Sequence, residues 1–398
     1  MEVSSLSVVL RSSSVALQGP AGTRAAQAKF GVAAGFIEVN RAGTACPSLL
    51  SRRDRPVMRC AWTRTVRWGV IGRLILLSLA VDNAWPALIR AEWSLNAGQK
   101  VSYTTDAFQF SSSRRLALSE DPTQPTIVPL EKPQDVIWEP MVEAVRTSSN
   151  RLGANELSFK ARGFIFTDKP IFNNGEYRIQ DLQQLNDSTS LLLRYRYVPN
   201  LFLGPNYERR SGERTIQEER VTSHRWRMEL EHRLTERWTA TAIGRFGLRY
   251  YNEAFAERDT FFYAVGPQVS YQVVPWTTLT LGYLYERGLA DGRNEPQFQD
   301  DVSYYLNMLS AGAEIRLLPK VTLSLMYLYL RKDFTSGIAG DPHVGRIDQT
   351  HQGWIELSYQ LTIRATLTAG FQRTQRTSTN IDRNFQDSIF SVGVLYQF

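Results

Sequence analysis

The sequence predicts an all-β fold, a closed antiparallel transmembrane β-barrel of about 14 strands. Three observations predict it. Apolar and polar side chains alternate with a period of two from about residue 93 to the C-terminus. Many of these runs have the roughly 9–11 residues that a tilted strand needs to cross a bilayer. The connections between the runs alternate between short turns and longer polar links, as they do in such barrels.

The N-terminal region is predicted to lie outside the barrel. Residues 1–57 are rich in Ala, Ser, Gly and Arg without a sustained period, and we interpret them as a misassigned upstream extension that is disordered. Residues 58–91 begin with Met58 and several arginines, continue into the apolar run Leu74–Val81, and end on small residues. These are the parts of a secretory signal peptide, and a buried amphipathic helix is the alternative. The barrel is then expected over residues 92–398.

Charge and cysteine are concentrated in the same N-terminal region. Residues 92–398 hold 34 basic and 35 acidic side chains, so the overall charge of +7 arises from the first 91 residues. The basic pI is therefore no argument for a nucleic-acid partner. Both cysteines, Cys46 and Cys60, also lie there. The predicted barrel accordingly has no disulfide, thiolate metal site or cysteine nucleophile.

Residues 226–233 show the strand pattern clearly. Trp226, Met228 and Leu230 share one face, and charged side chains occupy the other. Successive side chains of a strand point to opposite faces, so one face suits lipid and the other a polar lumen. The same reasoning predicts strands at 93–108, 135–146, 154–167, 188–198, 201–210, 220–233, 237–251, 259–273, 276–287, 301–317, 320–332, 346–361, 364–376 and 384–398.

Several segments between the predicted strands are less regular. Residues 168–187 are predicted as a long polar link, and Pro199-Asn200 as a short turn. The strand at 201–210 is the weakest prediction, because a Gly-Pro pair interrupts it. The Pro-rich segment 110–134 is expected to fold into the barrel or over its mouth.

The final strand resembles the closing strand of bacterial outer-membrane β-barrel proteins. Val392, Val394, Tyr396 and Phe398 share one face, and Phe398 is the last residue. The resemblance implies an integral protein of the outer membrane of a Gram-negative bacterium, in contact with outer-membrane lipid and lipopolysaccharide. It also implies that the barrel-assembly machinery reads these four residues as an assembly signal. The stretch Val101–Phe108, a Ser/Tyr alternation running into Asp and Phe, is similar to the first strand of the beta-barrel porin-2 family.

The sequence offers little catalytic chemistry. It has no CxxC or HExxH zinc motif, GxSxG nucleophile elbow or phosphate loop, so no enzyme activity, catalytic residue, metal or cofactor is predicted. Asp300 and Asp301 are adjacent and read as part of a solvated loop rather than a paired carboxylate site. His343 is placed in a polar loop. The other histidines read as interfacial or solvated side chains: His224, His232 and His351.

The predicted inner wall is strongly charged. The alternation of side chains along each strand assigns these residues to the lumen side: Lys160, Arg162, Arg194, Arg196, Arg225, Arg227, Glu229, Glu231, Arg233, Arg245, Arg249, Glu286, Glu314, Arg316 and Glu356. The basic ones gather on neighbouring strands. One interpretation is an electric field across a water-filled pore, which gives the pore a modest preference for anions. The other is that these side chains pair across strands and plug the lumen.

The favoured function is a porin-like channel through which small polar or anionic solutes diffuse passively. The alternative is an outer-membrane scaffold or export component associated with exopolysaccharide secretion. An outer-membrane hydrolase is a third, less favoured, interpretation.

Overall fold

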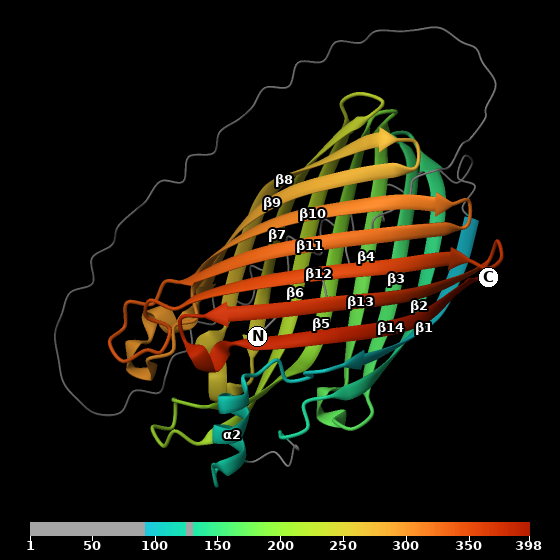
Figure 1. The fold of residues 1–398 in the computed structure, drawn as a ribbon. Coiled ribbons are helices and arrows are strands. Elements are labelled where there is room, and N and C mark those ends of the chain that lie inside the picture. The colour runs from blue at the N-terminus through green and yellow to red at the C-terminus, as the bar shows by residue number, and fades with distance from the viewer. Residues whose placement is uncertain (1–91, 125–129) are drawn as a thin grey trace, which may run out of the picture. The chain divides into compact units, whose positions relative to one another are not determined.

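The computed structural model describes residues 92–124 and 130–398. Fourteen antiparallel strands pair in sequence order, and β1 pairs with β14, which closes the barrel (Figure 1). The predicted fold class is therefore confirmed, whereas the predictions for residues 1–57 and 58–91 lie outside the described residues. The strands are β1 (Glu92–Thr104), β2 (Asp135–Asn150), β3 (Gly153–Phe166), β4 (Asn174–Asn186), β5 (Thr189–Tyr207), β6 (Ile216–Arg233), β7 (Trp238–Tyr251), β8 (Thr260–Val274), β9 (Thr277–Ala290), β10 (Tyr304–Leu318), β11 (Val321–Phe334), β12 (Ile347–Gln360), β13 (Ala365–Ser378) and β14 (Phe385–Gln397).

The seam between the first and last strands uses the predicted alternation. Val101 lies opposite Val392 in the β1–β14 register, and both side chains are exposed on the outer face. The backbone N–H of Phe398 donates to the carbonyl oxygen of Leu95 at 2.9 Å, so the last residue still takes part in closing the barrel. Closure removes the unpaired edges that an open sheet would expose to lipid.

The fourth and fifth strands differ from the prediction. The segment expected as a long link contains β4, and the two strands expected on either side of Pro199-Asn200 are one strand, β5. Asn200 has φ of 45° and marks an irregularity in the β5–β6 register, not a chain reversal. The errors compensate, so the strand count stays at fourteen. β4 was missed because its charged inner face gives it the composition of a polar loop.

One end of the barrel carries the long connections, and we call it the long-loop end. The first connection contains α2 (Ser112–Glu120), and four of the others contain short 3-10 turns. Figure 1 shows α2 at this end. The turns are η1 (Pro170–Phe172), η2 (Glu253–Arg258), η3 (Asp291–Asn294), η4 (Pro296–Phe298) and η5 (Ile381–Arg383).

A hydrophobic cluster fixes the first connection against the barrel. We call it the mouth cluster; it comprises Phe108, Phe110, Leu118, Leu130, Phe172, Phe202 and Ile216. Gly204 on β5 allows the close approach, because a Cβ there would lie 2.4 Å from the ring of Phe110 and the residue has φ of +120°. The connection therefore folds onto the end of the barrel, one of the two placements expected.

The outer face of the barrel is apolar. Leu193, Met228, Leu230, Phe246 and Leu281 come from four different strands, and all are exposed. A closed barrel with so much exposed hydrocarbon is stable only in lipid, since monomeric soluble proteins rarely expose such continuous apolar area. The chain is therefore an integral outer-membrane β-barrel. Among the described residues, no helix has the length and apolar character to cross a bilayer.

Candidate solute pathway inside the barrel

Basic side chains on the inner face form two rows across neighbouring strands. In the first row Lys160, Arg178, Arg196 and Arg225 are successive register partners on β3 to β6. In the second row Arg194, Arg227 and Arg245 are register partners on β5 to β7. Register partners point to the same face and lie about 5 Å apart along the hydrogen-bonding direction. We call these seven residues the basic rows.

Carboxylates pair with part of each basic row. Arg178 lies 3.1 Å from Glu143, and Arg196 lies 2.6 Å from Glu176. In the second row Arg245 pairs with Glu286 at 2.5 Å. Four carboxylates thus contact five of the seven basic side chains: Glu143, Glu176, Glu229 and Glu286. Cross-strand ion pairs therefore form on this wall, as one of the two sequence interpretations expects.

The remaining predicted inner-wall residues are more dispersed. Arg162 pairs with Glu139 on β2, and Arg249 donates to the hydroxyl of Tyr304 at 2.8 Å. Glu231 and Arg233 are exposed near the short-turn end of β6. Three others lie on β10 and β12, away from the basic rows: Glu314, Arg316 and Glu356.

Sequence reasoning missed two members of this wall, Arg178 and Glu176, because β4 was predicted as a link. The signal was present, since both alternate with Tyr177 and Ile179, which are exposed on the outer face. A period of two within a highly charged segment would have identified the strand.

An apolar stripe also lies on the inner face, and sequence reasoning missed it. It consists of Ile243, Ala264, Leu284 and Met308, with Leu330 packed against them, on β7 to β11. The middle of β11 is apolar on both faces, because Met326, Leu328 and Leu330 alternate with apolar outer residues, so its inner face could not be recognised from alternation alone. The lumen is therefore basic along one arc of strands and apolar along another.

A cavity of about 160 Å³ lies at the long-loop end. Its lining comes from α2, η2, η5 and the adjacent ends of several strands. The basic lining residues are Arg114, Arg249, Arg258, Lys332, Arg346, Arg376 and Arg383, and the acidic ones are Glu219, Glu286 and Asp348. Of the residues predicted for the inner wall, only Arg249 and Glu286 are among those that line it.

Several of the basic lining residues are paired. Arg258 lies 2.7 Å from both Glu219 and Asp300, and Arg346 lies 2.5 Å from Asp348. These pairs join loop residues to strand ends around the cavity, because Arg258 belongs to η2 and Glu219 to β6. They hold the loops in place but leave the positive excess of the lining uncompensated.

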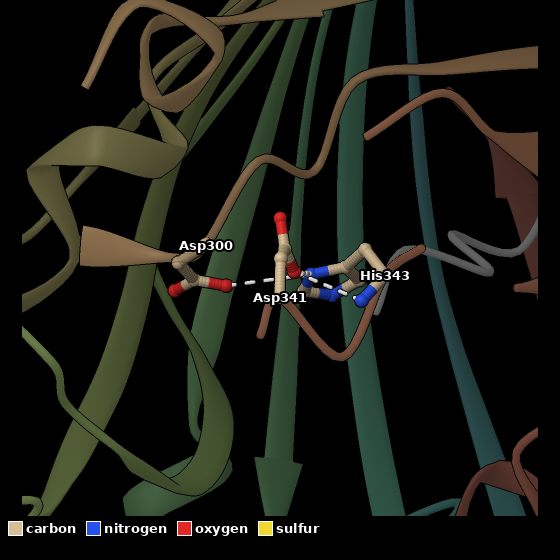
Figure 2. A group of neighbouring side chains, drawn as sticks. All are labelled: Asp300, Asp341 and His343. Carbon is tan, nitrogen blue, oxygen red and sulfur yellow. Dashed lines mark hydrogen bonds and ion pairs between the residues drawn. The ribbon is translucent and has the colours of Figure 1, made fainter. Parts of the chain in front are cut away.

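A buried acidic–histidine group connects two of the long loops. Asp300, Asp341 and His343 point toward one another in Figure 2, with His343 Nδ1 2.8 Å from Asp341 Oδ1 and 3.5 Å from Asp300 Oδ1. The prediction that Asp300 and His343 are solvated is wrong, because they are 0% and 4% exposed. Hydrogen bonds between the loops replace water here, and these long-range contacts have no local sequence signal.

The pKa values of His343 and Asp341 are both shifted from their ordinary values. Burial lowers the pKa of His343 below its ordinary value, which favours the neutral ring. Burial tends to raise the pKa of Asp341, but hydrogen bonds from His343 and Ser336 hold it below its usual value. The three ligand atoms lie within 4.8 Å of one another and could hold a metal ion. Arg258 on the other oxygen of Asp300 already supplies positive charge, so the group acts as a hydrogen-bonded link between loops.

No family model matches the chain, and no curated protein sequence matches it either. The resemblance to the beta-barrel porin-2 family is therefore not supported by a family model. Solved structures share the barrel. The anion-selective porin from Comamonas acidovorans is similar over 78% of this chain and 100% of that chain, at 8% identity and a TM-score of 0.38.

Two further structures are similar to the same degree. The outer membrane channel DcaP of Acinetobacter baumannii is 10% identical over 79% of this chain and 99% of that chain, with a TM-score of 0.43. A bacterial polysaccharide outer membrane secretin is 9% identical over 76% and 98%, with a TM-score of 0.41. At these values the likeness adds nothing to the barrel that the strand pairing already shows.

Proposed function

We propose that the chain is a porin-like channel that passes small polar or anionic solutes by passive diffusion. The basic rows carry this proposal, because seven cationic side chains lie side by side on the inner face of five adjacent strands. Closely spaced cations on a wall of low dielectric raise the local potential and concentrate anions.

A scaffold or export component is the second candidate. The mouth cluster covers part of the long-loop end, and ion pairs cross the inner wall, so these features favour a plugged barrel. An association with exopolysaccharide secretion stays an alternative of this kind. We propose no catalytic role, because Ser336 donates to Asp341 and not to His343, so these side chains do not form a nucleophile–base pair.

Single-channel recording of the purified full chain in planar bilayers tests the proposal. An open channel gives stable ohmic steps and a reversal potential that indicates anion preference in a salt gradient. A protein that inserts but gives no conductance steps would support the plugged scaffold instead. For partners we propose outer-membrane lipid, lipopolysaccharide and the barrel-assembly machinery, on the strength of the apolar outer face and the exposed C-terminal Phe398.

A further inference from the structure

Four basic side chains of the cavity at the long-loop end lack a carboxylate partner. Arg114, Lys332, Arg376 and Arg383 all line the cavity, and within the described part of the chain none has a carboxylate at ion-pairing distance. They come from α2, β11, β13 and η5. We call them the mouth quartet. By contrast, Arg258 and Arg346, which also line the cavity, are already paired with carboxylates.

Arg114 is held in position by the start of α2. Ser111 caps the helix by accepting from the backbone N–H of Arg114 at 3.1 Å. The hydroxyls of Ser111 and Ser113 donate to the backbone carbonyl and the carboxylate of Asp382, each at 3.0 Å. These bonds fasten α2 to η5, so Arg114 and Arg383 line the cavity from two elements that are tied together.

Two of the guanidinium groups present unused hydrogen-bond donors. Arg114 is 9% exposed, stacks over Phe110 at 3.7 Å, and its NH1 nitrogen has no hydrogen-bond partner among the described residues. Arg376 is 6% exposed, donates from Nε to the carbonyl of Arg383 at 2.7 Å, and its NH2 nitrogen likewise has no partner there. Both side chains are therefore fixed and yet incompletely bonded.

Burying such groups is costly. A buried charge without a partner and a buried donor without an acceptor both lose the hydration they would have in water. Burial and the neighbouring arginines lower the pKa of Arg383 to about 10, so this guanidinium stays charged at neutral pH. An anion in the cavity would satisfy the donors and offset the repulsion.

The size and lining of the cavity restrict the anion. A cavity of about 150 Å³ can hold a benzene-sized molecule of six heavy atoms, and this one is of similar volume, about 160 Å³. Leu203, Leu306 and Leu330 supply an apolar part of the lining. Leu330 also packs on the apolar stripe, so hydrocarbon continues from the cavity toward the lumen.

We propose that this cavity binds a small organic acid with two carboxylates on a short hydrocarbon body. Arginines of the mouth quartet bind the carboxylates, and the leucines contact the hydrocarbon. This inference rests on the proposed function, since it makes the cavity a recognition site at one end of an anion pathway.

Succinate is the probe, and calorimetry on the full chain in detergent micelles is the measurement. Butyrate has the same chain length with one carboxylate, and inorganic phosphate is an anion without hydrocarbon. We expect succinate to bind at least about tenfold more tightly than either, because only succinate offers both a second carboxylate for the arginines and a hydrocarbon body for the leucines. Equal affinity for butyrate or for phosphate would overturn the proposal.

Variants localise the site. The double variant Arg376→Gln and Arg383→Gln should weaken succinate binding about tenfold or more. The control, Lys320→Gln, removes one exposed charge at a short turn and should leave succinate binding unchanged. Lys332→Gln provides an independent variant if the double variant fails to fold. Unchanged succinate affinity in a folded quartet variant would contradict the assignment.

The same preparation separates this inference from the proposed function. Anion preference in a chloride gradient depends on the basic rows and needs no organic acid. Retained preference without succinate binding overturns only the recognition site. Succinate binding in a protein that gives no conductance overturns the channel and keeps the site.

Discussion

Replacing Leu281 by arginine tests the orientation of the whole barrel. Leu281 lies on β9 between Val269 and Ala311 in register, and its side chain is 65% exposed on the outer face. It lies four positions along the strand from Thr277, at the short-turn end of β9. At about 3.3 Å per residue and a tilt of about 40°, this is roughly 10 Å into an apolar band about 25 Å tall.

This depth is close to the middle of the bilayer, where an arginine on the lipid face costs about 2–4 kcal/mol. We expect Leu281→Arg to lower the free energy of unfolding by that amount. Urea titration in lipid vesicles, followed by tryptophan fluorescence, measures it. Gln372→Arg introduces the same residue near the middle of β13 on the inner face and should cost about 1 kcal/mol or less, because an inner-face side chain does not contact lipid. Equal losses in the two variants would refute the facing assignment.

Three further predictions concern assembly and the long-loop end. Changing Phe398 to Ser should reduce the amount of heat-modifiable barrel in outer membranes, because the exposed aromatic end of the closing strand is lost; normal levels would contradict its role as an assembly signal. Burial raises the pKa of Asp106 to about 7 although Arg115 opposes it, so the folded state holds a proton that the unfolded state releases. Stability should therefore fall as pH rises from about 4 to 7, and Asp106→Asn should flatten the unfolding free energy measured across that range. Gly204→Ala should cost roughly 1–3 kcal/mol by the same urea titration, because the new Cβ meets Phe110 at a strained φ, and an unchanged value would mean that the first connection is not packed on β5.

The barrel could be predicted because its signal is local. Alternation at Trp226, Met228 and Leu230 reports directly on a lipid-facing surface, and the same rule holds through β14. The prediction failed where composition or a local irregularity obscured a strand. β4 has the composition of a link, and the irregularity at Asn200 resembles a turn in sequence, although β5 pairs with β6 on both sides of it.

The candidate sites were less predictable because they depend on distant contacts. The alternation of side chains placed both Arg194 and Arg227 on the lumen side, but only the strand register shows that they are neighbours on adjacent strands. Burial of Asp300 and His343 arises from two loops about forty residues apart, and no periodicity encodes that contact. The mouth quartet likewise combines four elements, of which α2 was not predicted.

The most direct test of the central claim is the reversal potential across a salt gradient. The wild-type channel should show a weak anion preference near 0.1 M salt that fades at 1 M, because the Debye length shortens from about 10 Å to about 3 Å. Replacing Arg194, Arg196, Arg225 and Arg227 by Gln together should abolish the preference or turn it toward cations, since the carboxylates Glu143, Glu176 and Glu229 remain on that wall. A strongly cation-selective wild-type channel would contradict the account.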